Sequence, residues 1–163
     1  MIMKKLFFTT MIAMITMSVS AAGQKGDMAI GGNLLFGAGQ NYSNVGLGAK
    51  FSYNVTDPIR LLGEFDYFFE HNFTTMLDFS VYGHYLFPVA DRLLLFPAVG
   101  VGMMVYKTTI FNTTFSDNRA VFSLGGGAEF LLTDKFSLLG EFRLKLRDGS
   151  NRSNFVLGIA YKI

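Results

Sequence analysis

The chain has 163 residues, of which 50% are hydrophobic and 16% are charged, and its mean hydropathy is +0.34. It contains no cysteine, so disulfide bonds and thiolate metal sites are excluded. The 14 basic residues outnumber the 12 acidic ones only because of Lys4 and Lys5, so the charge balance gives no argument for nucleic-acid binding.

The N-terminal residues have the pattern of a secretory signal peptide. Lys4 and Lys5 precede an apolar run over 6–19, and a Ser-Ala-Ala exit follows it. An uncleaved membrane anchor is the alternative, but the apolar run is short for a membrane span. We expect cleavage after Ala22, or after Ala21. The expected organisation is a signal peptide at 1–22 and one domain at 23–163, which has 12 basic and 12 acidic residues.

Eight segments of the remaining chain have the alternation that predicts β-strands. In 44–54, for example, Phe51 and Tyr53 share a face opposite Lys50 and Ser52. No apolar run after the signal peptide is long and unbroken enough for a membrane helix, although the mean hydropathy is positive. The predicted strands are 28–37, 44–54, 60–70, 74–87, 93–106, 119–132, 136–147 and 153–163.

The clearest of these strands, 136–147, has two faces of different character. One face carries Phe142 and Leu144 with other apolar residues, and the other carries Glu141, Arg143 and Lys145. A strand of a soluble protein would bury its apolar face, whereas a strand of a membrane barrel turns that face to lipid and its charges inward. Aromatic residues near strand ends favour lipid contact. These aromatic residues are Tyr53, Phe87, Phe130 and Phe136.

The connections between the predicted strands alternate in character. Three are tight and contain aspartate, at 55–58, 88–91 and 133–135, and Asp, Thr and Pro all favour turns. The others are more polar and on the whole longer. Short turns at one end and longer loops at the other are typical of up-and-down barrels in outer membranes. The predicted loops are 38–43, 71–73, 107–118 and 148–152.

The last strand carries a more specific resemblance. Gly158, Tyr161 and Ile163 match the spacing of a glycine and two hydrophobic residues in the terminal signal of outer-membrane barrels, although an aromatic residue is commoner at the end. With the signal peptide, strand count and turns, the whole mature chain resembles the OmpA/OmpX-like eight-stranded outer-membrane β-barrel family, the small porin-family proteins. The resemblance implies an all-β transmembrane up-and-down antiparallel barrel. It also implies a monomer with outer-membrane lipid, periplasmic chaperones and the barrel-assembly machinery as partners, and no nucleic acid.

With the apolar faces outward, nine charged residues are expected to point into the lumen. An eight-stranded barrel is just wide enough for its own side chains, so these charges should pair and form a plug. A tight turn at 55–58 places Lys50 opposite Glu64. A narrow polar pore is the alternative. The predicted network is Lys50, Glu64, Asp66, Asp78, Glu129, Glu141, Arg143, Lys145 and Lys162, with His84 beside it.

Sequence signals for catalysis or cofactors are weak. Glu64 and Asp66 form a carboxylate pair on one face, but we expect each to face a cation rather than a substrate. His71 and His84 are the only histidines, and they are not spaced as metal ligands. Neither has the His-x-Ser signature of lipid A deacylase barrels. We therefore expect no enzyme, metal or cofactor.

The predicted loop 107–118 carries Ile110, Phe111 and Phe115 among threonines. It could form a contact surface for another cell or molecule, or fold its aromatic residues onto the barrel rim. The leading functional hypothesis is a structural or surface-interaction role. A narrow channel for small solutes and a soluble exported barrel that binds an apolar ligand are the alternatives.

Overall fold

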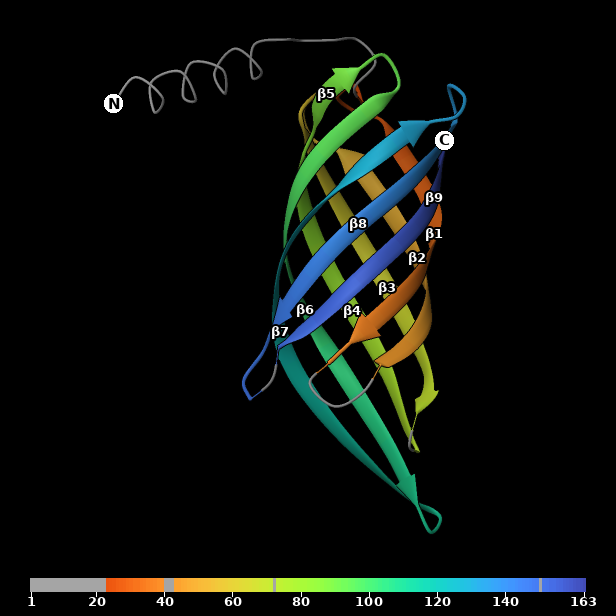
Figure 1. The fold of residues 1–163 in the computed structure, drawn as a ribbon, viewed down its shortest axis with the longest axis vertical. Coiled ribbons are helices and arrows are strands. Elements are labelled where there is room, and N and C mark those ends of the chain that lie inside the picture. The colour runs from red at the N-terminus through yellow and green to blue at the C-terminus, as the bar shows by residue number, and fades with distance from the viewer. Residues whose placement is uncertain (1–22, 40–42, 72, 150) are drawn as a thin grey trace, which may run out of the picture.

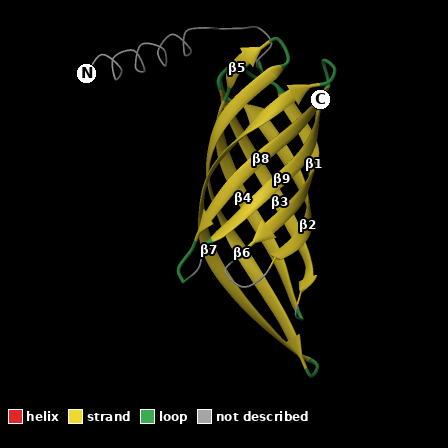
Figure 2. Ribbon diagram, in the orientation of Figure 1, coloured by secondary structure: helices red, strands yellow, loops and turns green. Residues whose placement is uncertain are grey.

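In the computed structural model, residues 23–39, 43–71, 73–149 and 151–163 are described, and they form one antiparallel β-barrel (Figures 1 and 2). The predicted signal peptide lies outside the described residues and stays a prediction. Among the described residues, no helix is long and apolar enough to cross a membrane. The strands are β1 (Met28–Ala38), β2 (Ser43–Asn54), β3 (Ile59–His71), β4 (Thr74–Tyr85), β5 (Phe87–Ala90), β6 (Leu93–Ile110), β7 (Thr113–Leu131), β8 (Phe136–Leu146) and β9 (Arg152–Lys162).

The barrel is closed by the pairing of β1 with β9, and the other strands pair with their neighbours in chain order. β4 and β5 both pair with β6, so they are successive pieces of one position in the wall, and the barrel has eight positions. The expected tight turn at 88–91 is wrong, because β5 occupies most of it and the turn lies at Asp91 and Arg92. Pro88 cannot donate a ladder hydrogen bond, and the β5–β6 register shifts just after it.

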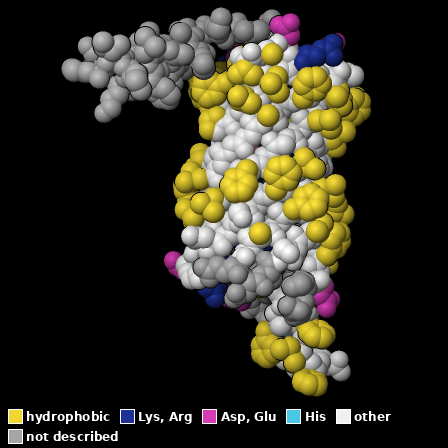
Figure 3. Space-filling model, viewed as in Figure 1, with side chains coloured by type: hydrophobic (Ala, Val, Ile, Leu, Met, Phe, Trp, Pro, Cys, Tyr) yellow, Lys and Arg dark blue, Asp and Glu magenta, His cyan; other side chains and the backbone are white. Residues whose placement is uncertain are grey.

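The alternation seen in the sequence sets which side chains face outward. On β8, Phe142 is 54% exposed, whereas its neighbour Arg143 is 1% exposed and points into the lumen. The same pattern holds around the barrel, and apolar side chains form belts on its outer surface (Figure 3). The soluble-barrel alternative requires the reverse orientation and is therefore wrong.

The expectation of a loop at 107–118 is also wrong, because these residues extend β6 and β7 into one long hairpin. The two strands pair without interruption from Leu93 opposite Phe130 to Ile110 opposite Thr113. The turn consists of Phe111 and Asn112, both with positive φ (48° and 63°), which is the pattern of a type I′ hairpin turn. Threonine and phenylalanine favour strands, and this propensity outweighs the polar character of the segment.

This hairpin extends beyond both of its neighbours. β4 pairs with β6 only as far as Thr74 opposite Thr108, and β8 pairs with β7 only from Phe122 onward. The hairpin therefore projects past the other connections at the end opposite the C-terminus (Figure 1). Residues 113–121 of β7 have no strand on the β8 side among the described residues, so one edge of the hairpin is free.

Candidate functional site

Arg143 on β8 is the centre of the charged lumen. Its Nη1 and Nη2 atoms donate to the Oε1 and Oε2 atoms of Glu64 on β3, at 2.5 and 2.9 Å. Its Nε and Nη2 atoms donate to Glu141 at 2.7 and 2.9 Å. The guanidinium carbon also lies 4.2 Å from the ring centroid of Tyr82. A planar cation held by two carboxylates and an aromatic ring offsets much of the cost of burying these charges.

A second ion pair, between Lys145 and Asp78, is fully buried beside the first. The Ser80 hydroxyl donates to Asp78 at 2.5 Å. Asp66 is different, although we expected it to face a cation. It lies opposite Asp78 in the β3–β4 ladder and beside the Glu64 carboxylate, and in the described part of the chain it has no ion pair. Gly48 makes room for it, because a Cβ there would overlap the Asp66 Oδ1 atom.

Lys50 stands opposite Glu64 in the β2–β3 ladder. Arg143 occupies the Glu64 carboxylate, and the described residues give Lys50 no ion pair. Its side chain extends toward Gly158 on β9, where a Cβ would lie 2.6 Å from the Lys50 Nζ atom. The absence of a side chain at Gly158 therefore has a local packing reason, because it leaves room for the Lys50 ammonium group. Its role in an assembly signal with Tyr161 and Ile163 stays a prediction.

Two apolar layers lie on either side of the charged centre, and the sequence analysis missed both. One layer consists of inward-facing residues near the end of the barrel that carries the β6–β7 hairpin. The other consists of inward-facing residues near the end with the short turns. The sequence signal was present, because apolar residues at these positions interrupt the polar face of their strands. The first layer is Leu35, Phe68, Met76 and Val156 with Tyr106, and the second is Leu86, Phe96, Ala98 and Leu139 with Ala160.

His84 belongs to the boundary between the second layer and the charged centre. Its ring stacks on Phe96, with the centroids 4.4 Å apart, and its Nε2 atom lies 4.0 Å from the Glu141 Oε1 atom. Neither ring nitrogen has a hydrogen-bond partner among the described residues. His84 therefore packs inside the closed lumen. The side chain of His71 lies outside the described part of the structure.

The end with the short turns carries a third polar group. Arg60 Nη1 lies 2.6 Å from the Glu129 Oε2 atom, and the Ser137 hydroxyl donates to the other carboxylate oxygen at 2.8 Å. Arg60 was not among the predicted lumen residues, although it shares the inward face with Glu64. Lys162 is not part of the lumen network. Its side chain is 45% exposed at the barrel mouth, where it pairs with Asp27 at 2.8 Å.

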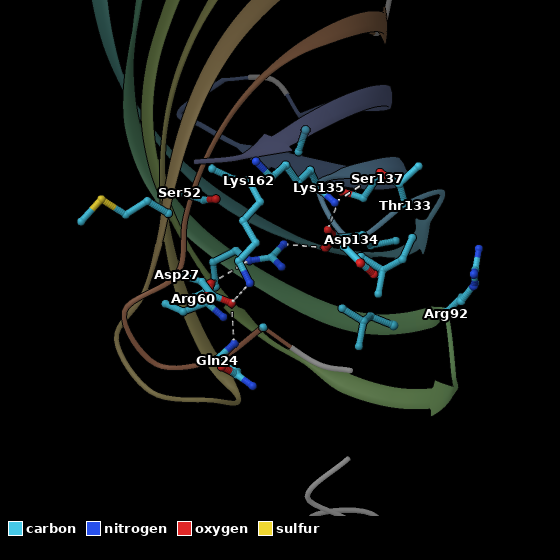
Figure 4. A pocket seen from close by; sticks show the side chains of 18 of the residues that line it. Gln24, Asp27, Ser52, Arg60, Arg92, Thr133, Asp134, Lys135, Ser137 and Lys162 are labelled. Carbon is cyan, nitrogen blue, oxygen red and sulfur yellow. Dashed lines mark hydrogen bonds and ion pairs between the residues drawn. The ribbon is translucent and has the colours of Figure 1, made fainter. Parts of the chain in front are cut away.

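A cavity of about 390 Å³ opens at this mouth (Figure 4). Arg60, Asn54 and Glu129 lie at its inner end, and the turns at 91–92 and 132–135 lie at its rim. Ala160 lines the cavity and also packs against the second apolar layer. Other lining residues are Gln24, Asp27, Ser52, Leu94, Ser137 and Lys162.

At the opposite end, Arg152 is buried against the Phe68 ring, 4.5 Å from its centroid, and its Nε atom donates to Asn154 at 2.9 Å. It also contacts Asn44 on β2. Arg152 was not predicted as an inward residue, because the last strand was expected to begin at 153 and begins at Arg152. Within the described ranges, no three His, Asp or Glu side chains are grouped to hold a metal ion.

A sequence profile of the outer membrane protein beta-barrel domain family matches residues 7–162. The chain belongs to this family. It is an eight-stranded antiparallel barrel of the bacterial outer membrane, as the sequence analysis predicted. In such barrels the short turns face the periplasm and the longer connections face outward, so the β6–β7 hairpin points out of the cell.

Solved structures with the same fold have different roles. The attachment invasion locus protein Ail of Yersinia pestis is 18% identical, covers 86% of this chain and 100% of its own, and has a TM-score of 0.63. Neisserial surface protein A is 7% identical, covers 84% and 96%, and has a TM-score of 0.70. The outer membrane enzyme PagL is 17% identical, covers 82% and 99%, and has a TM-score of 0.50. A comparison with curated proteins gives no significant match.

Proposed function

We propose that this outer-membrane barrel is a closed, non-catalytic surface protein that binds a partner outside the cell through its β6–β7 hairpin. The observation that carries this proposal is the combination of a free β7 edge with exposed apolar side chains. Family membership alone does not select this role, because barrels of this fold include a surface protein and an enzyme.

The hairpin has two unlike faces. Residues opposite each other in an antiparallel pair share a face, and Thr108 stands opposite Phe115. Side chains alternate along a strand, so Ile110 lies on the same side as Thr108 and therefore on the same side of the hairpin as Phe115. That side continues the lumen-facing side of Met104, which is fully buried. Phe115 is 61% exposed, and Phe111 at the tip is 98% exposed. The opposite side carries Lys107, Thr109, Thr114 and Ser116.

The free edge of β7 presents backbone N–H and C=O groups over 113–121. Exposed edges of this kind accept an additional strand, which uses the same hydrogen bonds as a sheet. Asp117 and Arg119 form an exposed ion pair on this edge, with 2.9 Å between Oδ2 and Nε. An extended peptide segment with apolar residues at alternate positions fits both the edge and Phe115.

A sulfated glycan is a second kind of ligand to weigh, because Ail has been solved in complex with the heparin analogue sucrose octasulfate. Polyanion binding requires a positive surface. Apart from the buried Arg152, the outward end of this chain has basic and acidic residues in equal number, so it does not favour such a ligand. These residues are Lys107, Arg119 and Arg147, and Glu70, Asp117 and Asp148.

The filled lumen supports a role without transport. The two apolar layers and the Arg143 cluster occupy the bore between the cavity and the outward end. We therefore rank the narrow-channel alternative second. The proposed absence of catalysis is supported by the place of His84 inside the lumen, away from lipid.

The proposal can be tested with a library of 12-residue peptides selected on the barrel in lipid nanodiscs. Selected peptides should alternate apolar and polar residues. Phe115→Asp should weaken their binding at least tenfold, because it places a charge beside the apolar positions. Thr114→Asp is the matched control on the opposite side of the hairpin and should change binding less than threefold. Equal effects of the two substitutions, or peptides that bind a variant lacking 107–116, would contradict the proposal.

A further inference from the structure

We propose that the cavity at the periplasmic mouth is a binding site for a small zwitterionic molecule of the amino-acid or short-peptide class. The inference is independent of the hairpin and of the proposed surface role. It rests on the donors left at the inner end of the cavity, on the carboxylates without an ion pair at its rim, and on its size.

The inner end of the cavity offers unused hydrogen-bond donors. The Arg60 side chain is only 9% exposed; its Nη1 atom is paired with Glu129, and its Nε atom lies 3.4 Å from the Asn54 Oδ1 atom. An arginine has five N–H donors, and those on Nη2 have no partner in the part of the chain that the structure describes. The Asn54 Nδ2 atom beside it is buried without a partner among the described residues.

These donors suit a carboxylate better than a phosphate. The planar edge of a guanidinium matches the two oxygens of a carboxylate. Glu129 already lies against the same guanidinium, so a group with two negative charges would meet stronger repulsion than a group with one. The site therefore selects a single negative charge at its inner end.

The rim offers the opposite charge. Arg92 donates to the Leu132 carbonyl oxygen at 3.2 Å, and Lys135 lies 5.8 Å from the Tyr161 ring centroid on the outer wall. Both cations also line the cavity, and each already has a neighbouring group, the Leu132 carbonyl or the Tyr161 ring (Figure 4). Asp91 and Asp134, which line the rim, have no ion pair among the described residues. Two free carboxylates there suit an ammonium group.

The size of the cavity agrees with a ligand of this class. A cavity of about 390 Å³ lies at the small end of the range for ligand sites. One wall adjoins the second apolar layer, because Ala160 lines the cavity and packs against that layer. The occupant is therefore a small molecule held with its carboxylate inward and its ammonium at the rim.

The experiment uses amide chemical shifts of the whole barrel in nanodiscs, with glycylglycine, acetate, ethylammonium and inorganic phosphate as probes at equal ionic strength. Glycylglycine should shift amides around Asn54, Arg60 and 131–137, and bind at least threefold more tightly than acetate or ethylammonium. Phosphate should bind more weakly than acetate. Equal binding of all probes, or shifts spread over both ends of the barrel, would overturn the proposal.

Variants separate the two ends of the ligand. Replacing Asp91 and Asp134 by asparagine should weaken glycylglycine binding about two- to tenfold and leave acetate unchanged, because the ammonium contact is lost. Asp148→Asn, an exposed carboxylate at the outward end, is the control. Arg60→Lys keeps the charge beside Glu129 but removes the free guanidinium edge. It should weaken the binding of both glycylglycine and acetate. If the rim variants bind glycylglycine as the unmodified barrel does, the proposal is wrong.

Discussion

Lys50 and Glu64 face each other across the β2–β3 ladder, yet Glu64 is held by Arg143 from the other side of the lumen. Strand register fixes which backbone positions are neighbours, but it does not decide which cation a carboxylate selects. Arg143 can donate two parallel hydrogen bonds to Glu64, which a lysine ammonium cannot do.

We predict that Arg143→Met destabilises the barrel by about 3–5 kcal/mol, because it leaves Glu64 and Glu141 buried without their cation. Lys50→Met should cost clearly less, since no carboxylate depends on Lys50 as its ion-pair partner. The midpoint of urea unfolding, followed by the shift in gel migration of unheated samples, measures both. Equal losses for the two variants would contradict the assignment of Arg143 as the centre of the network.

Phe142→Arg should destabilise the barrel by about 2–4 kcal/mol, because Phe142 faces the lipid and a cation there is costly near mid-bilayer. Phe115→Arg is the matched control, since this phenylalanine is also exposed but lies on the projecting hairpin. It should leave the free energy of unfolding in lipid vesicles almost unchanged. A harmless Phe142→Arg would mean that β8 does not face the membrane.

The purified barrel should show no steady conductance in planar bilayers. Arg143→Ala alone should also remain closed, because the apolar layers around Phe68 and Phe96 still fill the bore. Alanine at Phe68, Phe96 and Arg143 together should produce open events. Stable channels in the unmodified protein would contradict the plugged lumen.

Mass spectrometry of the protein from the outer-membrane fraction should find its N-terminus at Ala22 or Gly23. This follows from the small residues that end the predicted signal peptide. An intact Met1 in that fraction would show that the segment is retained.

Much of the barrel follows from a period of two in the sequence. Alternation on 136–147 correctly puts Phe142 and Arg143 on opposite faces, and the membrane-barrel interpretation assigns Phe142 to the outside. The hairpin at 107–118 was not assigned in this way, because the polar character of the segment was given more weight than the strand propensity of its threonines and phenylalanines. The apolar layers were missed because only charged positions on the inward face were treated as the plug, and Arg60 was missed although the same alternation places it on that face.

Ion-pair choice needs three-dimensional distances. Asp66 shares the inward face with Glu64, and the sequence treats the two alike, yet only Glu64 meets a guanidinium. Across the lumen, the partner is set by barrel closure and strand tilt, neither of which is visible in a single strand.

The two apolar layers also isolate the charged centre from dissolved ions on both sides. Salt weakens ion pairs that water can reach, and it has little effect on pairs that water cannot reach. The Arg143 and Lys145 pairs are fully buried, whereas the Lys162–Asp27 pair at the mouth is exposed. The barrel should therefore keep the same internal structure in dilute and in saline surroundings, while its periplasmic mouth responds to ionic strength.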